Sequence, residues 1–495
     1  GTALKTLTVD ASGKASNVNL SIPAAIETLN ITGKADLKLD TGLTNIRTVD
    51  GSKAEGNLTF SNTATMTSVK TGSGNDTVTV AAAVASGETI NLGAGNDKLV
   101  KGAGSVAAGS IIDGGAGIDS LDAALVNVGN AGVFANFETL SLTATAADLD
   151  LALVNKSTFT TIAIDGANTS TVRNVSTSQS LAVNAAGTST TLLFKNVDGK
   201  ADAYTINFNA DNAANTNAGI VVINKIETVT VNSVGKTAVT NNTITLTDDA
   251  AKSLVITGDK DLTVNFATGF GKASANATDG LGVSTIDASA STAGITLGTS
   301  ISNLKTAWSG LTIKGGAGKD TIDMTGLILP ATDSKIIVNA GAGDDTIVTT
   351  LAGGTLTGGA GKDTFNVALA LVEALKTTEA TGVVKTTITD LTAGDTIKFA
   401  NKGTEVFNKL QVNVSTASNL DKALDLALAG DGSTNGIINW FQFAGNTYIV
   451  EDVNAAAAPA GTPEAQAGDI VVKINGMVDL TNSGYDAGAN TLTIA

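Results

Sequence analysis

The stretch Gly315-Gly316-Ala317-Gly318-Lys319-Asp320-Thr321-Ile322 decides the fold, because its pattern occurs six times in the chain. Each copy has glycine at its second and fourth positions, aspartate at its sixth and an apolar residue at its eighth. The copies form two clusters of three. The first cluster consists of Thr71-Gly72-Ser73-Gly74-Asn75-Asp76-Thr77-Val78, Leu92-Gly93-Ala94-Gly95-Asn96-Asp97-Lys98-Leu99 and Gly114-Gly115-Ala116-Gly117-Ile118-Asp119-Ser120-Leu121. The second adds Ala340-Gly341-Ala342-Gly343-Asp344-Asp345-Thr346-Ile347 and Gly358-Gly359-Ala360-Gly361-Lys362-Asp363-Thr364-Phe365.

The residue types in this pattern suit a hard cation. Glycine permits positive φ and lets backbone carbonyl groups turn inward. Aspartate supplies an anionic oxygen, which Ca²⁺ prefers among side chains. Ca²⁺ takes six to eight oxygen ligands, so one loop cannot enclose it, but two stacked loops can. The pattern therefore predicts several structural Ca²⁺ ions between stacked loops, and tight turns without metal are the alternative.

The spacing of the loops predicts a solenoid. The glycines at the second loop position lie at 72, 93 and 115 in the first cluster and at 316, 341 and 359 in the second. The last step, of 18 residues, is two nonapeptides, the smallest coil of a parallel β-roll. A looser repeat of short alternating segments begins at Ile26, Leu43 and Met66 and returns as Phe137-Glu138-Thr139-Leu140. We therefore predict an all-β fold, a right-handed parallel β-helix or β-roll solenoid.

Composition excludes several classes of function. The chain has 495 residues, a formal charge of −16, and neither cysteine nor histidine. Disulfides, imidazole-based zinc sites and Ser-His-Asp or Cys-His catalysis are therefore ruled out. Arg47 and Arg173 are the only arginines, which argues against nucleic acid as a partner. No run of 18 apolar residues predicts a transmembrane segment, and we expect no enzymatic activity.

The pattern divides the chain into five predicted regions. Residues 1–66 and 126–310 are predicted as parallel β-solenoid, residues 67–125 and 311–370 as the two loop clusters, and residues 371–495 as a mostly β C-terminal cap. Residues 367–376 are expected to form a short helix or a strand. Within the cap we expect one amphipathic helix over 419–429, strands over 439–443, 447–450 and 469–474, and a surface loop over 455–466.

The loops resemble the calcium-binding repeats of the RTX (repeats-in-toxin) family. The segment Ile388-Thr389-Asp390-Leu391-Thr392-Ala393-Gly394-Asp395-Thr396-Ile397-Lys398-Phe399 looks like the stretch that follows the last repeat in that family. The segments Trp440-Phe441-Gln442-Phe443-Ala444-Gly445-Asn446-Thr447-Tyr448-Ile449-Val450 and Thr491-Leu492-Thr493-Ile494-Ala495 resemble the C-terminus of RTX-type bacterial surface-layer (S-layer) proteins. The likeness covers roughly residues 60–495.

This resemblance implies a ligand set. The metal ligands would be carbonyl groups within the first four positions of each loop, together with the six loop aspartates. Asp390 and Asp395, in the segment after the last loop, are counted with them as metal ligands. Thr71, Leu92 and Ala340 depart from the family's glycine at the first position, and we expect them to distort their coils at most.

The resemblance also implies a location and partners. It implies export through the C-terminus by a type I secretion system, folding outside the cell when calcium is met, and self-assembly into a two-dimensional lattice on a Gram-negative cell surface. Lipopolysaccharide anchoring would be carried by a missing N-terminal region. The alternative is an RTX adhesin or fibrous exoprotein that contacts other cells or surfaces.

Two further groups of residues have open interpretations. Trp308 and Trp440 are expected to pack in the core rather than to form a platform for carbohydrate. Seven aspartates in the middle of the chain are expected to be solvated turn residues rather than additional calcium ligands: Asp202, Asp211, Asp248, Asp249, Asp259, Asp261 and Asp279.

Overall fold

The protein is described by a computed structural model that covers residues 4–144, 148–199, 201–330, 335–368, 384–399, 405–428, 436–452 and 469–495. Within these residues it is all-β, with a parallel β-solenoid of about 16 turns, one α-helix and a mostly β C-terminal part. The predicted fold class is confirmed. The chain divides into two compact units. Unit 1 contains Gly1–Gly199, Tyr204–Asn209 and Thr216–Ile223, and unit 2 contains Lys200–Ala203, Ala210–Asn215 and Asn224–Ala495.

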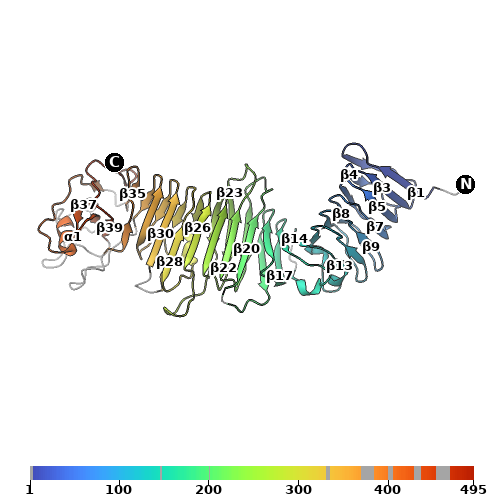
Figure 1. Cartoon of the computed structure of the whole chain (residues 1–495), viewed down its shortest axis with the longest axis horizontal. Helices are drawn as coiled ribbons and strands as arrows, with labels where there is room; N and C mark the ends of the chain where they lie inside the picture. Colours follow the sequence, from blue (N-terminus) through green and yellow to red (C-terminus); the bar gives the residue numbers. More distant parts are fainter. Residues whose placement is uncertain are drawn as a thin grey trace. The chain divides into compact units, whose positions relative to one another are not determined.

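Unit 1 is built from three stacks of parallel strands (Figure 1). The first stack contains β1 (Thr6–Asp10), β3 (Thr28–Gly33), β5 (Thr48–Ala54), β7 (Ser68–Lys70), β9 (Thr89–Asn91), β11 (Ile111–Asp113) and β13 (Phe134–Ala135). The second contains β2 (Ser16–Asn19), β4 (Leu37–Thr41), β6 (Leu58–Ser61), β8 (Thr77–Val80), β10 (Lys98–Lys101), β12 (Ser120–Asp122), β14 (Thr139–Leu142), β16 (Thr161–Ile164), β18 (Ser180–Val183) and β20 (Ala203–Phe208). The third contains β15 (Asp148–Asp150), β17 (Thr169–Val175), β19 (Ser189–Phe194) and β21 (Asn217–Val222). Short 3₁₀ turns lie at Ala123–Leu125, Ala131–Val133 and Leu151–Leu153.

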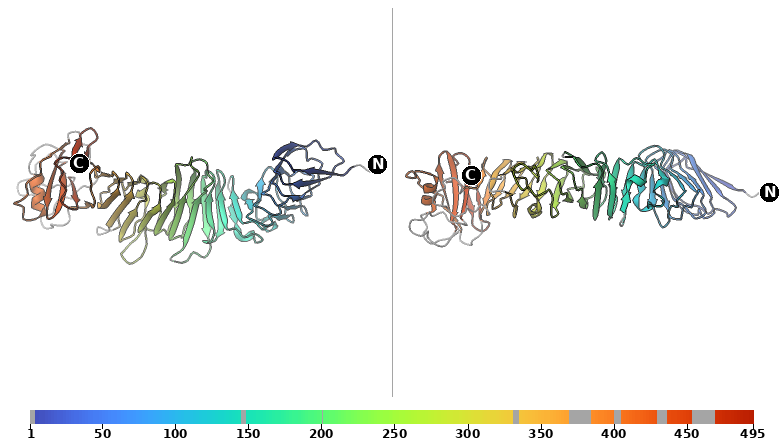
Figure 2. Two further views of the ribbon diagram at one scale, coloured as in Figure 1. Left: turned by 45° about the horizontal axis from the view of Figure 1, so that its top comes forward. Right: turned by 90° about the horizontal axis from the view of Figure 1, so that it is seen from below.

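Unit 2 contains two such stacks and the cap, and its parallel strands are visible in all three ribbon views (Figures 1 and 2). One stack contains β22 (Thr228–Ser233), β24 (Ser253–Gly258), β26 (Thr285–Ser291), β28 (Gly310–Lys314), β30 (Lys335–Ala342), β32 (Gly354–Ala360) and β34 (Thr386–Ile388). The other contains β23 (Asn241–Thr247), β25 (Asp261–Phe266), β27 (Ile295–Leu297), β29 (Thr321–Asp323), β31 (Thr346–Val348), β33 (Thr364–Asn366) and β35 (Thr396–Lys398). A 3₁₀ turn lies at Thr299–Asn303.

The core of each unit is a set of apolar columns, because side chains alternate along each strand and neighbouring strands pair in register. In unit 1, one column runs through Leu29, Val49, Val69, Ile90 and Ile112. In unit 2, a column of fully buried side chains runs through Val229, Leu254, Ile286, Ile313, Val338, Leu356 and Ile388. Aliphatic side chains of similar size fill a narrow core at every turn, which agrees with the low aromatic content.

The pairing corrects one detail of the predicted looser repeat. The predicted segments begin at residues 26, 43 and 66, which makes the steps unequal. In the structure Thr28 pairs with Thr48 and Thr48 with Ser68, so the steps are equal and Ile46, not Leu43, corresponds to Ile26 and Met66. Leu43 is buried in the corner before β5. Two apolar residues three positions apart occupy this corner, and the alternation pattern alone selects the wrong one.

The same 13-residue coil precedes the first loop of both clusters. Residues 48–60 (TVDGSKAEGNLTF) match residues 285–297 (TIDASASTAGITL) in pattern. In both copies an aspartate accepts hydrogen bonds from a serine two residues later: Asp50 from Ser52 and Asp287 from Ser289. Both strands also break register with the preceding coil, next to Thr32 and Thr257. We call these two segments the lead-in coils.

The cap of unit 2 replaces parallel stacking by antiparallel strands. β34 pairs with β39 (Ile470–Ile474), and the sheet continues antiparallel through β38 (Asn446–Asp452) to β37 (Ile437–Phe443), which pairs with β36 (Val406–Phe407). β35 pairs antiparallel with β41 (Thr491–Thr493), which pairs with β40 (Gly484–Asp486). The predicted helix is present as α1 (Leu420–Leu428), and Asn419 caps it by accepting a hydrogen bond from the Lys422 N–H at 2.9 Å.

The predicted strands of the cap are confirmed, with β37 and β38 longer than expected. The side chain of Trp440 is buried and donates to the Lys409 carbonyl at 3.3 Å, so its predicted core role is confirmed. The predicted loop over 455–466 and most of the predicted element over 367–376 lie outside the described residues. Among the described helices, none has the length and apolar character needed to cross a bilayer.

The apolar columns predict where unit 2 is sensitive to mutation. Phe270 is fully buried and its ring centre lies 5.1 Å from that of Phe266. We expect Phe270→Ala to lower the free energy of unfolding of this unit by about 3–5 kcal/mol, through lost burial and a residual cavity. Urea unfolding followed by circular dichroism measures the change. Ile328→Ala, at a side chain that is 78% exposed, serves as the control and should change it by less than about 0.5 kcal/mol. Equal effects of the two substitutions would contradict the assignment of the core.

Candidate metal centre

The structure brings the six loop aspartates into two columns inside the coil corners. Asp76, Asp97 and Asp119 form the first column, in unit 1, and all three are fully buried. Asp320, Asp345 and Asp363 form the second, in unit 2, and are at most 2% exposed. The in-register pairing of β8, β10 and β12, and of β29, β31 and β33, places one carboxylate directly over the next. Each loop therefore contributes one inward-facing carboxylate per coil.

Hydrogen bonds between coils hold the first column. Asp97 Oδ1 accepts from the Asp76 N–H at 2.6 Å, and Asp119 Oδ1 accepts from the Asp97 N–H at 2.8 Å. The column begins at the lead-in coil, where the Leu58 N–H donates to Asp76 Oδ1 at 2.6 Å. Every aspartate thus accepts the amide of the coil before it. We call this arrangement the carboxylate ladder.

The second column repeats the ladder in unit 2. The Ile295 N–H of the lead-in coil donates to Asp320 Oδ1 at 2.7 Å. The Asp320 N–H donates to Asp345 at 2.7 Å, and the Asp345 N–H donates to Asp363 at 3.0 Å. The same bonds in the same order in both units show that the loop sequence itself produces the ladder.

The Oδ2 atoms of these aspartates make the columns candidates for binding a cation. Asp97 Oδ2, Asp119 Oδ2 and Asp345 Oδ2 are buried and have no hydrogen-bond partner. A buried carboxylate oxygen without a partner is costly, and each such group calls for a physical explanation. Asp76 and Asp320 differ, because their Oδ2 atoms accept the N–H of Gly72 and Gly316 in their own loops.

The glycines provide room for these oxygens and carry carbonyl groups towards them. At Gly315 a side-chain Cβ would lie 2.0 Å from Ala340 O of the next loop and 2.1 Å from Asp320 Oδ2. Both oxygens therefore approach the same face of Gly315. At Gly114 and Gly358, which hold the same first position in their loops, Oδ2 of the loop's own aspartate lies 2.9 and 2.2 Å from such a Cβ.

Glycine is required at the second and fourth positions for two different reasons. In the second and third loops of each cluster these glycines have positive φ, as at Gly93 (92°) and Gly361 (142°). In the first loop of each cluster they do not, so the expectation of positive φ is wrong there. Close approach requires glycine instead, because a Cβ at Gly72 would lie 2.0 Å from Ala54 O of the lead-in coil.

The remaining predicted loop residues fall on the same corners. Second-position carbonyl groups accept the third-position N–H of the next loop: Ala94 donates to Gly72, Ala116 to Gly93 and Ala342 to Gly316, at 2.8–3.0 Å. Leu92 and Ala340 are fully buried at the first position, and no register break interrupts the strands beside them. The Thr71 hydroxyl donates to the Leu92 carbonyl. Each bonded carbonyl keeps a second lone pair, so it remains a possible ligand.

Burial changes the acidity of these carboxyl groups. It raises the pKa of Asp97 to about 8, with Asp76 and Asp119 adding repulsion, and raises the pKa of Asp345 to about 7. Burial likewise raises the pKa of Asp119 and of Asp320 to about 6. Without a cation, each column therefore keeps protons at a pH where exposed aspartates are charged.

A second ladder runs through the fifth loop positions and was not anticipated from the sequence. Asn57 Oδ1 accepts from the Asn75 N–H at 2.6 Å, Asn75 Oδ1 from the Asn96 N–H at 2.8 Å, and Asn96 Oδ1 from the Ile118 N–H at 2.9 Å. In unit 2, Asp344 Oδ1 accepts from the Lys362 N–H at 2.9 Å. These bonds run in the opposite direction to the carboxylate ladder. The recurrence of Asn or Asp before the loop aspartate was the available signal.

Each column ends on a fourth carboxylate from a coil without the loop pattern. In unit 2 this is Asp395, which accepts the Asp363 N–H at 2.9 Å, while Asp390 accepts the N–H groups of Gly358 and Gly359 at 3.0 and 2.8 Å. Both predicted residues thus contact the third loop. In unit 1 the fourth carboxylate is Glu138, which accepts the Asp119 N–H at 2.9 Å. The sequence contained Glu138 as part of a strand motif, and nothing there distinguished it from Glu27.

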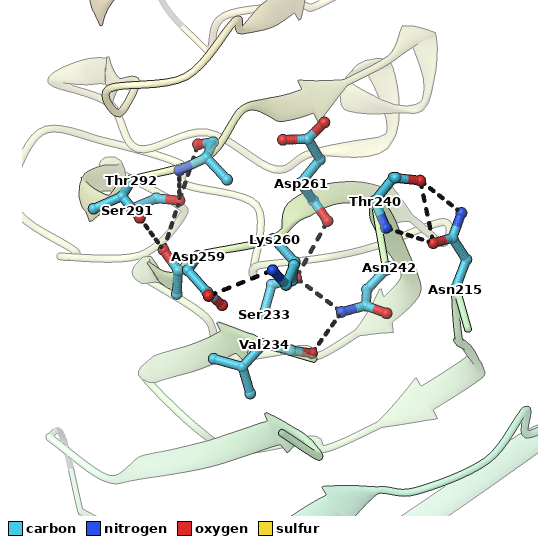
Figure 3. A network of polar contacts seen from close by, with 12 residues as sticks. Asn215, Ser233, Val234, Thr240, Asn242, Asp259, Lys260, Asp261, Ser291 and Thr292 are labelled. Carbon is cyan, nitrogen blue, oxygen red and sulfur yellow. Dashed lines mark hydrogen bonds and ion pairs between the residues drawn. The ribbon is translucent and has the colours of Figure 1, made fainter. Parts of the chain in front are cut away.

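The seven aspartates outside the loops are mostly turn residues, as expected. Asp259 pairs with Lys260 at 3.5 Å, and Asp261 accepts the Gly294 N–H at 2.8 Å at the foot of the second lead-in coil. Figure 3 shows the Asp259–Lys260 ion pair and the Asp261 side chain, next to the buried pair in which Asn242 donates to the Ser233 hydroxyl at 3.1 Å. Asp202 is half-buried, and its Oδ2 is shielded from solvent without a hydrogen-bond partner. Asp248 departs furthest from the expectation. It is fully buried at the end of β23, and burial raises its pKa to about 8, so the expectation of solvation is wrong for this residue.

Trp308 is half-buried rather than fully packed. It lines a cavity of about 210 Å³ together with the turn around Asp279. Asp279 accepts the N–H groups of Ala275, Asn276 and Leu281, which lower its pKa to about 2. That aspartate therefore orders its own turn.

Within the described part of the chain, no three acidic side chains gather around one point. The carboxylates lie one per coil along each column. A cation in these corners must therefore take backbone carbonyl oxygens as well as carboxylates. The donor set is hard oxygen throughout, which fits Ca²⁺.

The raised pKa values predict how pH affects the metal-free protein. An aspartate whose folded pKa exceeds its unfolded value stabilises the fold at low pH and loses this contribution as pH rises through the folded pKa. In EDTA we expect the melting temperature to fall between about pH 4 and pH 8, most steeply up to pH 6, where all four of Asp97, Asp119, Asp320 and Asp345 contribute. Thermal melts by circular dichroism measure this.

A matched pair of variants isolates the columns from the general effect of charge. Asp97→Asn keeps an acceptor for the Asp76 N–H but removes the titrating group, so it should flatten the dependence on pH. Asp10→Asn removes an exposed charge and should leave the slope unchanged. A melting temperature in EDTA that does not depend on pH would refute the predicted repulsion.

Position within a column predicts unequal effects of losing an aspartate. Asp97→Ala leaves the Asp76 N–H without its acceptor, and Asp76→Ala leaves those of Leu58 and Gly72, at a cost of about 1–3 kcal/mol for each buried N–H. Only Asp97 has a loop aspartate on both sides. We therefore expect Asp97→Ala to lower the free energy of unfolding in excess calcium by more than Asp76→Ala, as measured by urea unfolding. Equal losses would show that the middle position has no special role.

No protein-family model matches this chain, and no curated protein matches it significantly. What its coil corners bind is therefore inferred from their own residues.

Proposed function

We propose that this chain is a non-enzymatic, secreted structural protein that folds on binding calcium and assembles into a two-dimensional surface layer outside a Gram-negative cell. The observation that carries the proposal is the pair of carboxylate ladders with buried, unpartnered Oδ2 atoms. The resemblance of the loops and of the C-terminus to RTX-type surface-layer proteins supplies the cellular context.

The residues of each column suit a structural rather than a catalytic role. The carboxylates of Asp97, Asp119 and Asp345 accept amides of neighbouring coils and are shielded from solvent, so they offer no access to a substrate. Histidine and cysteine are absent from the whole chain. A regular array of short strands is a scaffold, and its outward residues remain available for contacts with other molecules.

Calcium, when bound, would neutralise the facing carboxylates and join one coil to the next. Asp76, Asp97, Asp119, Asp320, Asp345 and Asp363 would hold it, together with carbonyl groups of the loops. Extracellular calcium modules bind with Kd values on the order of 10⁻⁴ to 10⁻³ M. At cytosolic calcium concentrations the columns would remain repulsive, which keeps the chain loose enough to be threaded through a secretion channel. Binding and folding then share one free energy.

Removing calcium tests the proposal directly. We expect EDTA to reduce the β-sheet circular dichroism signal and the melting temperature, and calcium to restore both. Magnesium at equal concentration is the control, because it demands near-ideal octahedral geometry and gives up its water reluctantly. An unchanged spectrum and melting temperature in EDTA would refute the role of calcium.

Electron microscopy of the purified protein separates a surface layer from an adhesin. With calcium we expect ordered sheets that disperse in EDTA. Calcium-dependent folding that yields only dispersed rods would contradict lattice assembly and favour the adhesin or fibrous exoprotein.

A further inference from the structure

The coil that follows the third loop of the first cluster lacks the glycine-aspartate pattern, yet it faces that loop with two oxygen-bearing groups. This coil runs from β13 into β14 and contains Asn136 and Glu138. Glu138 accepts the Asp119 N–H at 2.9 Å. Asp119 itself is fully buried, and its Oδ2 has no hydrogen-bond partner.

The Oδ2 atom of Asp119 points to a place that a second oxygen also reaches. A Cβ at Gly114 would lie 2.1 Å from Asn136 O and 2.9 Å from Asp119 Oδ2. Glycine leaves this space open. The backbone of Asn136 has a φ of 57°, and its side chain donates to Asp113 Oδ1 at 2.8 Å, which fixes the direction of the turn. Asp113 also accepts the Gly115 N–H at 3.1 Å and therefore positions both sides of the space.

The same three-part arrangement occurs between two complete loops in unit 2. There the space beside Gly315 is approached by Asp320 Oδ2 and by Ala340 O, and Asp345 of the next coil accepts the Asp320 N–H. Asn136 O occupies the position equivalent to that of Ala340 O, and the Glu138 carboxylate accepts the N–H that the Asp345 carboxylate accepts in unit 2. The turn from Asn136 to Glu138 is three residues shorter than that from Ala340 to Asp345, and the extra methylene of glutamate lets its carboxylate still reach the amide of Asp119.

From this correspondence we propose an additional divalent-cation site at the end of the first column, formed by Asp119 Oδ2, Asn136 O and the Glu138 carboxylate. It rests on the proposed calcium-binding function and extends it to a coil without the loop pattern. The ligand class is a hard cation of the size of Ca²⁺, because all three groups are oxygen donors and two are anionic. Water molecules would complete its coordination.

The site explains why the first column ends on a glutamate. Glu27, in the equivalent motif Ile26-Glu27-Thr28-Leu29, forms an exposed ion pair with Lys5 at 2.6 Å and lies beside no glycine loop. Glu138 instead adds a second negative charge beside the buried Asp119. A cation at this point would remove that repulsion and join the loop cluster to the solenoid that follows.

Counting bound ions tests the site. Purified protein is dialysed against excess calcium, and calcium per chain is measured by elemental analysis. Glu138→Gln should bind one ion fewer than the wild type while keeping its circular dichroism spectrum, because glutamine still accepts the Asp119 N–H. Glu27→Gln is the matched control and should bind the wild-type number.

A second variant removes the space rather than the charge. Gly114→Ala should lose the same single ion, because its Cβ would lie 2.1 Å from Asn136 O. If the wild type binds several ions and both variants bind the same number, the additional site is refuted while the proposed function stands. If the wild type binds no calcium, the proposed function itself is refuted.

Discussion

The hydrogen bond from one coil's amide to the next coil's carboxylate is the interaction on which the loop regions depend. Parallel strands pair only where coils keep the same register, and the geometry of the turns helps to set that register. At these corners Asp97 and Asp119 in unit 1, and Asp345 in unit 2, accept amides from the coil before them. In unit 1 the asparagines at the fifth positions bond in the opposite direction, so those corners are held from both sides. Glycine is needed there because the backbones approach too closely for a Cβ.

The hydrogen bonds that fix the register also place several carboxylates close together and out of contact with water. Carboxylates that accept amides inside a corner are stacked one above another and removed from water, and both effects disfavour the charged form. The middle member, Asp97, is the most strongly affected, because burial raises its pKa to about 8 and the neighbour on each side adds repulsion. The protein can satisfy such a column with protons or with a cation. Protons suffice at low pH, but at neutral pH a cation neutralises two carboxylates at once. The bonds that hold register thus leave each buried column in need of protons or a cation.

Much of this arrangement follows from the sequence, and the exceptions have physical causes. The period of the loops identified the solenoid, and the capped amphipathic helix at Asn419 was recognisable from residue types alone. The corner residue Leu43 was misplaced because two apolar residues compete for one inward position, and only pairing with the neighbouring coil decides between them. Glu138 was not recognisable as a ladder member, because its partner Asp119 is distant in sequence and Glu27 occupies the same motif without that partner. Asp248 looked like a solvated turn residue, but the strand before it sets an inward alternation that continues through it. Local pattern therefore predicts elements well and predicts contacts between coils poorly.

The two columns also have a defined beginning and end, which argues that each is a unit rather than an arbitrary run of loops. Each begins on a lead-in coil, where the Leu58 or Ile295 N–H donates to the first aspartate. Carbonyl groups of the same lead-in coil lie against the glycine at the second position of the first loop. Each ends on a carboxylate from a coil of different sequence, Glu138 or Asp395. A ladder without a closing acceptor would leave the last buried amide unpaired, at a cost of about 1–3 kcal/mol. The closing residue therefore matters as much as the loops, although it belongs to no repeat. Because the same beginning and the same kind of end occur in both units, the structural unit is the whole stack of coils and not only its glycine-rich turns.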